Sequence, residues 1–109
     1  MYRYNAHVIK VYDGDTITVD IDLGLGVWLR GQKIRLAGID TPEMRGDEKE
    51  EGRKVRDIVR DLILNEDITI RTYRDKRGKY GRWLADVHYE GLFINEWLLE
   101  AGHAKVYGK

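Results

Sequence analysis

Two short acidic motifs contain side chains that could bind a metal ion. Asp13-Gly14-Asp15-Thr16 lies between two β-branched segments, and Asp40-Thr41-Pro42-Glu43 follows the strand-like run Ile34-Arg35-Leu36. Taken alone, the first motif is a hairpin turn and the second is a strand exit. If the strand after Asp15 pairs beside the strand that leads to Asp40, both carboxylates lie at one end of a barrel. Carboxylate and carbonyl oxygens are the ligands that Ca²⁺ and Mg²⁺ prefer, so the two motifs together predict a metal site.

Three further side chains would complete a set for hydrolysing phosphodiester bonds. Glu43 follows Asp40 by three residues across a proline and could reach a water molecule on the far side of the ion. Arg35 lies on the strand that leads to Asp40, and Arg82 ends a basic segment. Phosphodiester hydrolysis needs a Lewis acid, a base near water and bidentate donors for the developing charge. The acidic motifs and the two arginines together indicate this chemistry.

The charges are distributed unevenly, although 19 basic and 19 acidic residues give the chain a formal net charge of zero. Residues 71–82 contain six basic side chains and one acidic one, whereas residues 40–51 contain two basic and six acidic ones. A solvated hairpin and a solvated helix start would explain both segments. A basic phosphate-binding loop beside an acidic metal site would also explain them, with Tyr73 and Tyr80 able to stack on bases.

The elements that must position these residues are mostly strands. Alternating or β-branched sequence predicts strands over residues 6–12, 16–21, 27–36, 67–73 and 83–89. The third of these is either a strand pair or one strand bent near Gly31. Residues 104–107 can form one more short strand.

Two helices are predicted among the strands. Residues 47–64 have the apolar stripe of an amphipathic helix, and a short second helix contains Ile94 and Trp97 and ends at Gly102. The order of elements predicts an α+β, mainly β fold in a single domain over residues 1–109. It is that of an OB-fold: a five-stranded barrel with a helix between strands 3 and 4 and a short C-terminal helix.

The composition excludes several classes of site. The chain has no cysteine, so disulfides, thiolate nucleophiles and cysteine-ligated metals are ruled out. His7, His88 and His103 are too dispersed for a zinc site. No apolar run approaches 18 residues and no signal peptide is present, so the chain is expected to be cytoplasmic as written, or secreted if a signal was removed.

The same motifs carry a resemblance to a known family. The motifs that carry it are Asp13 to Thr16, Arg35-Leu36, Ile39 to Glu43, Lys79-Tyr80-Gly81-Arg82, Ile94-Asn95-Glu96 and Ala104-Lys105-Val106. Taken in their order and spacing along the chain, these six short motifs resemble the staphylococcal nuclease (thermonuclease) family over about residues 6 to 107. The resemblance implies an OB barrel and Ca²⁺-dependent cleavage of single-stranded DNA and RNA, leaving 3′-phosphate and 5′-hydroxyl ends.

The resemblance also assigns roles to individual residues. It makes Asp15 and Asp40 the calcium carboxylates, with the backbone carbonyl of Thr41 beside them. It makes Glu43 the residue that positions or deprotonates the attacking water, and it gives Arg35 and Arg82 to the scissile phosphate. Lys79 and Tyr80 match residues that contact a terminal phosphate, and Tyr107 falls near the family's base-stacking tyrosine.

Other interpretations remain open at this point. OB-folds often bind single-stranded nucleic acid without cutting it, so a non-catalytic binding module is the alternative function. Asp20 could serve as an outer partner of the metal, and Trp28, Trp83 and Trp97 are expected to pack in the core or at the barrel rim. The chain stops at Lys109, where the family's third helix should follow. We therefore expect either an abbreviated variant or an apolar contact between two copies on that flank.

Overall fold

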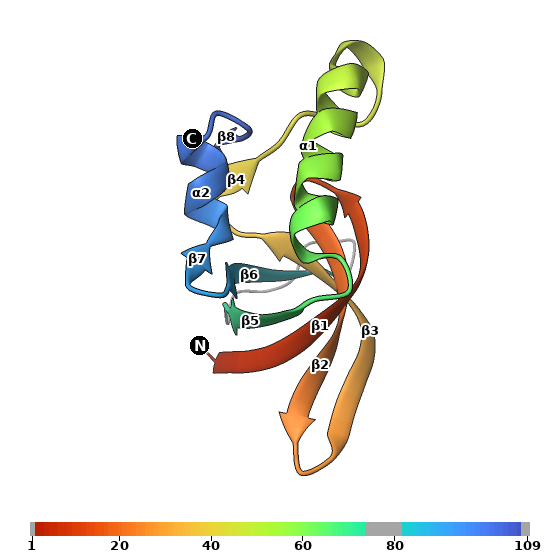
Figure 1. Cartoon of the computed structure of the whole chain (residues 1–109), viewed down its shortest axis with the longest axis vertical. Helices are drawn as coiled ribbons and strands as arrows, with labels where there is room; N and C mark the ends of the chain where they lie inside the picture. Colours follow the sequence, from red (N-terminus) through yellow and green to blue (C-terminus); the bar gives the residue numbers. More distant parts are fainter. Residues whose placement is uncertain (1, 74–81, 108–109) are drawn as a thin grey trace.

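The computed structural model describes residues 2–73 and 82–107 (Figure 1). Among these residues, a 3₁₀ turn and the longer helix follow the fourth strand, and a short second helix lies near the C-terminal end. The strands are β1 (Tyr2–Asp13), β2 (Thr16–Gly24), β3 (Val27–Leu36), β4 (Ile39–Asp40), β5 (Asp67–Thr72), β6 (Trp83–Tyr89), β7 (Leu92–Phe93) and β8 (Lys105–Val106). The helical segments are η1 (Gly46–Glu48), α1 (Lys49–Ile63) and α2 (Ile94–Glu100).

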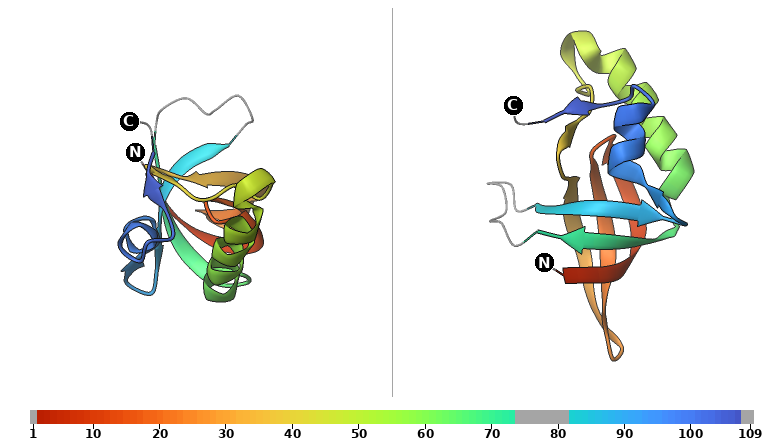
Figure 2. Two further views of the ribbon diagram at one scale, coloured as in Figure 1. Left: turned by 90° about the horizontal axis from the view of Figure 1, so that it is seen from above. Right: turned by 90° about the vertical axis from the view of Figure 1, so that its left-hand side faces the viewer.

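Five strands close into a barrel. They pair antiparallel in the order β3-β2-β1-β5-β6, and β6 returns to pair parallel with β3, so the sheet has no break between its first and last strands (Figure 2). The closing ladder joins Ile34 to Trp83, Arg35 to Leu84 and Leu36 to Ala85. The short strands β4 and β8 form a separate antiparallel pair. The predicted α+β OB-fold is confirmed.

The barrel interior is filled by the alternate side chains of each strand. In β3, Ile34 and Leu36 are fully buried while Arg35 between them faces the other side. Helix α1 covers one end of the barrel with Val55, Val59 and Ile63 (Figure 1). The predicted helix started at residue 47, but a 3₁₀ turn occupies residues 46–48, so the α-helix begins later. No helix in the described part of the chain is both long and apolar enough to cross a membrane.

A buried asparagine fixes α2 to the barrel. Asn95 Oδ1 accepts the Val87 backbone N–H at 2.9 Å, and Asn95 Nδ2 donates to the carbonyls of Ala37 at 2.9 Å and Ala85 at 3.2 Å. Asn95 is only 3% exposed, so these bonds replace the water that the amide would otherwise bind. Its place in the Ile94-Asn95-Glu96 motif is therefore explained by structure, since it ties β6 to the end of β3.

The β2–β3 hairpin extends past the barrel along the long axis of the molecule (Figure 1). Residues 27–36 form one strand, bent at a bulge where Gly31 has a φ of 66°. Asp20 lies at this bulge, accepts the Gly31 N–H at 2.9 Å and pairs with Arg30 Nη1 at 3.0 Å, so its carboxylate is engaged within the hairpin, and its role as an outer partner of the metal stays a prediction. Trp28, 42% exposed on the hairpin, departs from prediction, whereas Trp83 and Trp97 pack against the core.

Candidate active site

Asp15 joins three separate segments at one rim of the barrel. Its Oδ2 atom lies 3.0 Å from Arg35 Nη1 on β3 and accepts the Thr41 backbone N–H at 3.1 Å. Its Oδ1 atom accepts the Thr16 hydroxyl at 3.2 Å. Its backbone carbonyl accepts the Leu36 N–H at 2.9 Å. The Asp15 side chain is 9% exposed, and burial of a charge at this depth is compensated by these donors.

The turn that carries Asp15 is shaped by close packing. Asp13 Oδ1 accepts the Asp15 N–H at 3.1 Å, which closes a local turn. A Cβ atom on Gly14 would lie 2.6 Å from Val55 Cγ1 and 2.9 Å from the side chain of Thr41. Glycine is required here because α1 and the loop after β4 both press against the turn. Burial, together with the nearby Asp15 carboxylate, raises the pKa of Asp13 to about 7.

Arg35 is the centre of the cluster. Its Nη1 atom contacts Asp15 and donates to the Ile39 carbonyl at 3.1 Å, while its Nη2 atom lies 3.7 Å from Asp40 Oδ1. The side chain is 12% exposed. Its Cζ atom lies 4.9 Å from the centre of the Tyr107 ring. One guanidinium therefore holds the two predicted metal carboxylates together and also contacts the predicted base-stacking tyrosine.

The short β4–β8 pair brings the last two members to this rim. Asp40 pairs with Lys105 across the two strands, and the Tyr107 N–H donates to the Gly38 carbonyl at 3.0 Å. The structure thus places Asp15, Arg35, Asp40 and Tyr107 in one cluster, as expected from the sequence.

The oxygen atoms of this cluster fit a hard divalent cation. Asp15 and Asp40 flank a single guanidinium, and Thr41 follows Asp40 directly. The hydroxyl oxygen of Thr41 is buried without a hydrogen-bond partner. Within residues 2–73 and 82–107, no three His, Asp or Glu side chains gather closely enough to hold a metal by themselves. Two carboxylates with neutral oxygens nearby are ligands of the class that suits Ca²⁺ or Mg²⁺ rather than zinc.

Glu43 is held through its backbone. The Glu43 N–H donates to Glu48 Oε1 at 2.8 Å, and the residue itself is exposed. A Cβ atom on Gly52 of α1 would collide with the Glu43 carbonyl and would lie 3.0 Å from the Pro42 carbonyl. Among the described residues, no hydrogen bond or ion pair ties the Glu43 carboxylate to Asp15 or Arg35. The loop is fixed by η1 and α1, while its carboxylate faces solvent.

Arg82 lies immediately before β6, beside the start of the parallel β3–β6 ladder. It precedes Trp83, which pairs with Ile34, and Arg35 pairs with Leu84. Because Ala85 and Val87 face the core, strand alternation places Arg82 on the same side of the sheet as Arg35. Lys79 and Tyr80 lie outside the described residues.

A hollow in the described part of the surface adjoins the cluster. A pocket of about 360 Å³ is lined by Ala37, Gly38, Leu84, Tyr73 and Asp86, directly beside the strand ends that carry Arg35 and Tyr107. In it the Tyr73 hydroxyl donates to Asp86 Oδ2 at 2.7 Å, and this bond raises the pKa of Tyr73.

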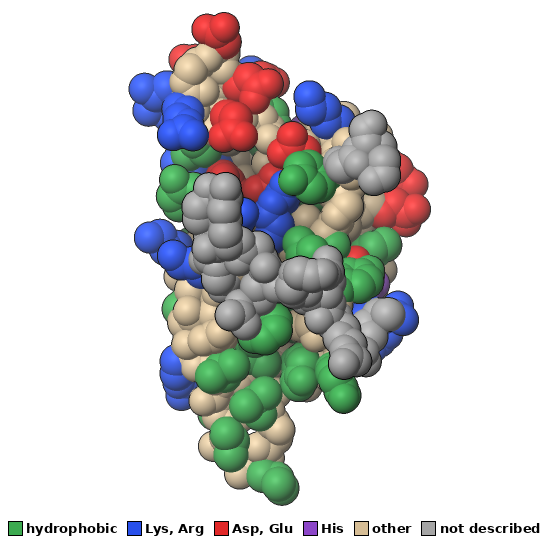
Figure 3. Space-filling view, turned by 180° about the vertical axis from the view of Figure 1, so that it is seen from behind, with side chains coloured by type: hydrophobic (Ala, Val, Ile, Leu, Met, Phe, Trp, Pro, Cys, Tyr) green, Lys and Arg blue, Asp and Glu red, His purple; other side chains and the backbone are tan. Residues whose placement is uncertain are grey.

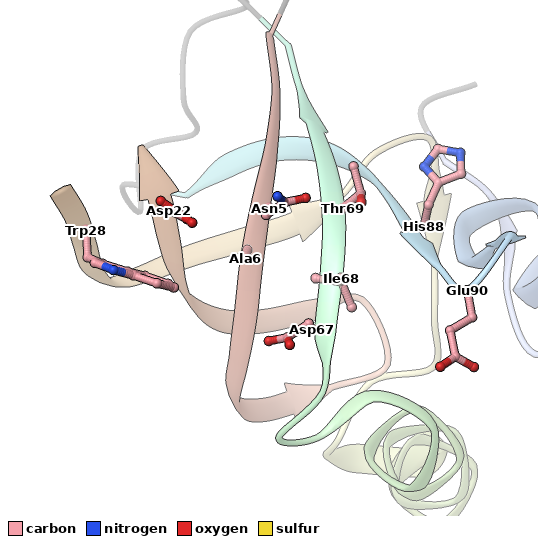
Figure 4. Close-up of a pocket in the computed structure, with 9 residues that line it drawn as sticks. All are labelled: Asn5, Ala6, Asp22, Trp28, Asp67, Ile68, Thr69, His88 and Glu90. Carbon is pink, nitrogen blue, oxygen red and sulfur yellow. The ribbon is translucent and has the colours of Figure 1, made fainter. Parts of the chain in front are cut away.

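A groove of about 320 Å³ lies on a different part of the barrel (Figure 4). Strand register places Trp28, Asp22, Asn5, Thr69 and His88 in one row across it. It shares no residue with the Arg35 cluster. Its three carboxylates, from Asp22, Asp67 and Glu90, make it unsuited to a phosphodiester.

Sequence reasoning missed the residues that hold the cluster in place. Gly14 and Gly52 are needed because another segment approaches each of them closely, and Glu48 is needed as an acceptor for a backbone N–H. A glycine inside the otherwise regular helix pattern was the one signal that could have identified Gly52.

Comparison with known proteins assigns the family. A family model described as staphylococcal nuclease homologue matches residues 33–109. The thermonuclease of Staphylococcus hyicus is 32% identical over 101 residues, which cover 90% of this chain and 56% of that protein. An uncharacterized endonuclease of Haemophilus influenzae is 33% identical over 105 residues, covering 96% of this chain and 53% of that protein. The chain spans little more than half the length of these two relatives. Because the matched residues include Arg35, Asp40, Thr41, Glu43 and Arg82, and the barrel is the one expected, the chain belongs to the staphylococcal nuclease homologue family.

Proposed function

We propose that this chain is a Ca²⁺-dependent nuclease that hydrolyses phosphodiester bonds of single-stranded DNA and RNA and leaves 3′-phosphate and 5′-hydroxyl ends. The observation that carries the proposal is the position of Arg35, which lies 3.0 Å from Asp15 and 3.7 Å from Asp40. A binding module has no need for two carboxylates gathered beside a guanidinium, because carboxylates repel the phosphates that it must bind.

The metal would be held by Asp15, Asp40 and the backbone carbonyl of Thr41. These oxygens belong to the class that Ca²⁺ prefers, and the buried Thr41 hydroxyl supplies a further neutral oxygen nearby. When bound, the cation would supply Lewis-acid polarisation of a phosphoryl oxygen.

The two arginines would bind the scissile phosphate. Arg35 already has its guanidinium fixed by the Ile39 carbonyl and by Asp15, so it loses little freedom when it binds an anion. Arg82, immediately before the adjacent strand β6, would provide the second guanidinium. Planar guanidiniums match two phosphate oxygens at once, which stabilises the charge that develops in the transition state.

Glu43 would orient or deprotonate the attacking water. It is exposed, so water has access to it, and its backbone is fixed by Glu48 and Gly52. A carboxylate on a loop held at two points can keep one orientation toward the phosphate.

The remaining nucleotide would lie beside Tyr107. This ring is 58% exposed and stacks on Arg35, and the adjacent pocket has Leu84 and the Tyr73–Asp86 pair on its walls. An aromatic face beside an open pocket suits a base in any sequence. Lys79 and Tyr80 are proposed to contact a terminal phosphate.

The proposal is tested by incubating end-labelled single-stranded DNA and RNA with the protein in Ca²⁺, in Mg²⁺ and in chelator. We expect cleavage with Ca²⁺ only, and products whose 3′ ends require a phosphatase before they can be extended. Calcium binding measured by calorimetry without substrate should disappear in Asp15→Asn and persist in the control Asp57→Asn. Undiminished cleavage in excess chelator would contradict the metal assignment. Binding of DNA without cleavage in every metal would instead support the binding-module alternative.

A further inference from the structure

The β2–β3 hairpin exposes a cluster of apolar side chains at the opposite end of the molecule from α1 (Figures 1 and 3). Leu25 at its tip is fully exposed, and Val27 is 53% exposed. No charged residue lies between Asp22 and Arg30. The hairpin patch, as we call this cluster, consists of Leu23, Leu25, Val27, Trp28 and Leu29. It exposes on the order of 500 Å² of apolar surface, a size at which patches on soluble proteins usually mark an interaction site.

Part of the patch continues the core-facing side of the barrel. Leu29 pairs directly with Ile21, which is 4% exposed, so both side chains lie on the same face of the ribbon. By alternation Leu23 and Val27 lie on that face too. Beyond the end of the barrel this apolar face has nothing packed on it in the part of the chain described, since these residues are 40% or more exposed.

The same hairpin has an unpaired strand edge. Strand β3 pairs with β2 along its length, but it pairs with β6 only from Ile34 to Leu36. Among the described residues, no strand pairs with the outer edge of residues 27–33. An exposed apolar edge strand is a template for pairing with another strand.

The free edge indicates which class of partner fits. Insertion of the hairpin into lipid would leave the unpaired N–H and C=O groups of this edge in hydrocarbon, which costs several kcal/mol for each group. Binding of nucleic acid needs positive charge, but Arg30 is paired with Asp20 at 3.0 Å and the patch has no other cation. A β-strand from a protein can hydrogen-bond the unpaired backbone groups of the edge and can also bring apolar side chains against the exposed ones.

We propose that the outer edge of β3 pairs antiparallel with the same edge of a second copy, so that the apolar side chains of the two β3 strands lie side by side in one continuous ribbon. The edge is self-complementary about a twofold axis. With the axis at Trp28, Val27 lies opposite the partner's Leu29. With the axis at Leu29, Trp28 lies opposite the partner's Arg30, a contact that Arg30 and Trp28 already make within one chain at 5.1 Å. Neither register opposes like charges.

The size of the contact agrees with a weak dimer. Edge-to-edge pairing covers mainly the β3 side chains of each patch and leaves Leu23 on β2 exposed, so the contact is smaller than a standard stable interface. The bulge at Gly31 ends the regular edge and restricts pairing to the hairpin end of β3. This contact involves a different surface from the flank on which a dimer was expected, and it does not depend on the proposed nuclease activity.

The first test measures the mass of the intact chain by sedimentation from about 1 μM to about 1 mM. We expect the mass to rise from 12.8 kDa toward twice that value. The double variant Val27→Lys, Leu29→Lys should stay monomeric, while the control Ile9→Lys, Tyr12→Lys, which alters exposed apolar residues of β1, should still dimerise. Circular dichroism and thermal midpoints confirm that both variants are folded.

A second test does not depend on disruptive variants. Because the chain has no cysteine, Trp28→Cys and Leu29→Cys each introduce a single thiol. A residue at the twofold axis lies opposite itself with Cα atoms about 4.5–5.5 Å apart, which a disulfide can span. We expect one of these variants to form covalent dimers on oxidation and Tyr12→Cys to remain monomeric. Monomeric mass at all concentrations, cross-linking at Tyr12 instead, or hairpin-dependent binding of a monomer to phosphatidylcholine vesicles would overturn the proposal.

Discussion

The Arg35 cluster and the β2–β3 hairpin reverse the usual distribution of polar and apolar groups. At the rim, Asp15 and Thr41 are each 6% exposed and the Arg35 side chain is 12% exposed. On the hairpin, Leu25 is fully exposed and its apolar neighbours are about half exposed. Figure 3 shows the contrast on one face, with acidic side chains near the upper end and hydrophobic ones over the lower end. Each arrangement disfavours folding when considered alone.

The two regions differ in how the unfavourable arrangement is compensated. The rim is compensated within the chain, because each buried charge has partners on another segment. Within the described residues nothing covers the apolar side chains of the hairpin, so only a partner molecule could remove them from water. Departures from local rules of folding concentrate where a protein functions. The comparison therefore predicts that changes at the rim alter activity and stability, whereas changes on the hairpin alter association and leave activity intact.

The largest effect is expected from Arg35→Lys. An ammonium cannot contact Asp15, the Ile39 carbonyl and Asp40 in the same geometry, nor can it bind two phosphate oxygens at once. We expect kcat/KM for DNA cleavage to fall by about 10³-fold with the fold retained. Steady-state kinetics would be compared with Arg56→Lys, which changes an arginine paired with Asp57 at 3.0 Å on α1. Equal activity of both variants would show that the rim is only structural.

The next effect is expected from Glu43→Ala, which removes the carboxylate that faces solvent. Loss of a base or water-orienting group should lower kcat by about 10²-fold while KM changes little. Thermal stability should be nearly unchanged because, within the described residues, no hydrogen bond or ion pair joins the Glu43 carboxylate to the rim, and the residue is exposed. The matched control is Glu50→Ala in the first turn of α1. A variant with normal kcat would remove Glu43 from the mechanism.

A smaller effect on rate, coupled to stability, is expected from Gly52→Ala. The new methyl group would collide with the Glu43 carbonyl and press on that of Pro42, so the loop must shift. We expect a destabilisation of about 1–3 kcal/mol, reduced by the better helix propensity of alanine. We also expect kcat to fall about tenfold, because a small displacement of a positioned group slows the reaction. Denaturant unfolding and kinetics on Arg53→Ala, an exposed change next to it, give the reference. Loss of stability with unchanged kcat would mean that Gly52 does not position Glu43.

Most of the fold could be predicted from the sequence, because alternation and helix periodicity act locally. Strand β6 was predicted with its observed bounds, and helix α1 was predicted within two residues of its ends. Residues 27–36 form one bent strand because Asp20 on β2 accepts the Gly31 N–H at the bulge. The sequence of residues 27–36 alone could not distinguish a strand pair from one bent strand. Trp28 was misplaced for a related reason, since periodicity shows that a residue is apolar but not that its strand continues beyond the barrel.

The candidate site could be predicted in part. The motifs identified the side chains that meet at the rim, because Asp15, Arg35 and Asp40 are the residue types that this chemistry needs. They did not identify Gly14, Gly52 or Glu48, since each is required by a contact with a segment distant in sequence or by a backbone N–H. Side-chain types report chemistry, whereas close approach between segments is visible only once the segments are placed.

The smallest effect, and the sharpest test of the contrast between the two regions, is expected at the hairpin tip. Leu25 has a φ of 56° between two glycines that also have positive φ, and its side chain contacts solvent alone. Residues other than glycine and asparagine are disfavoured in this left-handed conformation by about 1 kcal/mol. Leu25→Asn should therefore raise the free energy of unfolding of the monomer by about 0.5 kcal/mol and leave DNA cleavage unchanged, while it weakens dimerisation. Chemical denaturation at low protein concentration measures the first effect and sedimentation the last. If the substitution lowered monomer stability, Leu25 would be serving the fold, and the apolar tip would need no partner to explain it.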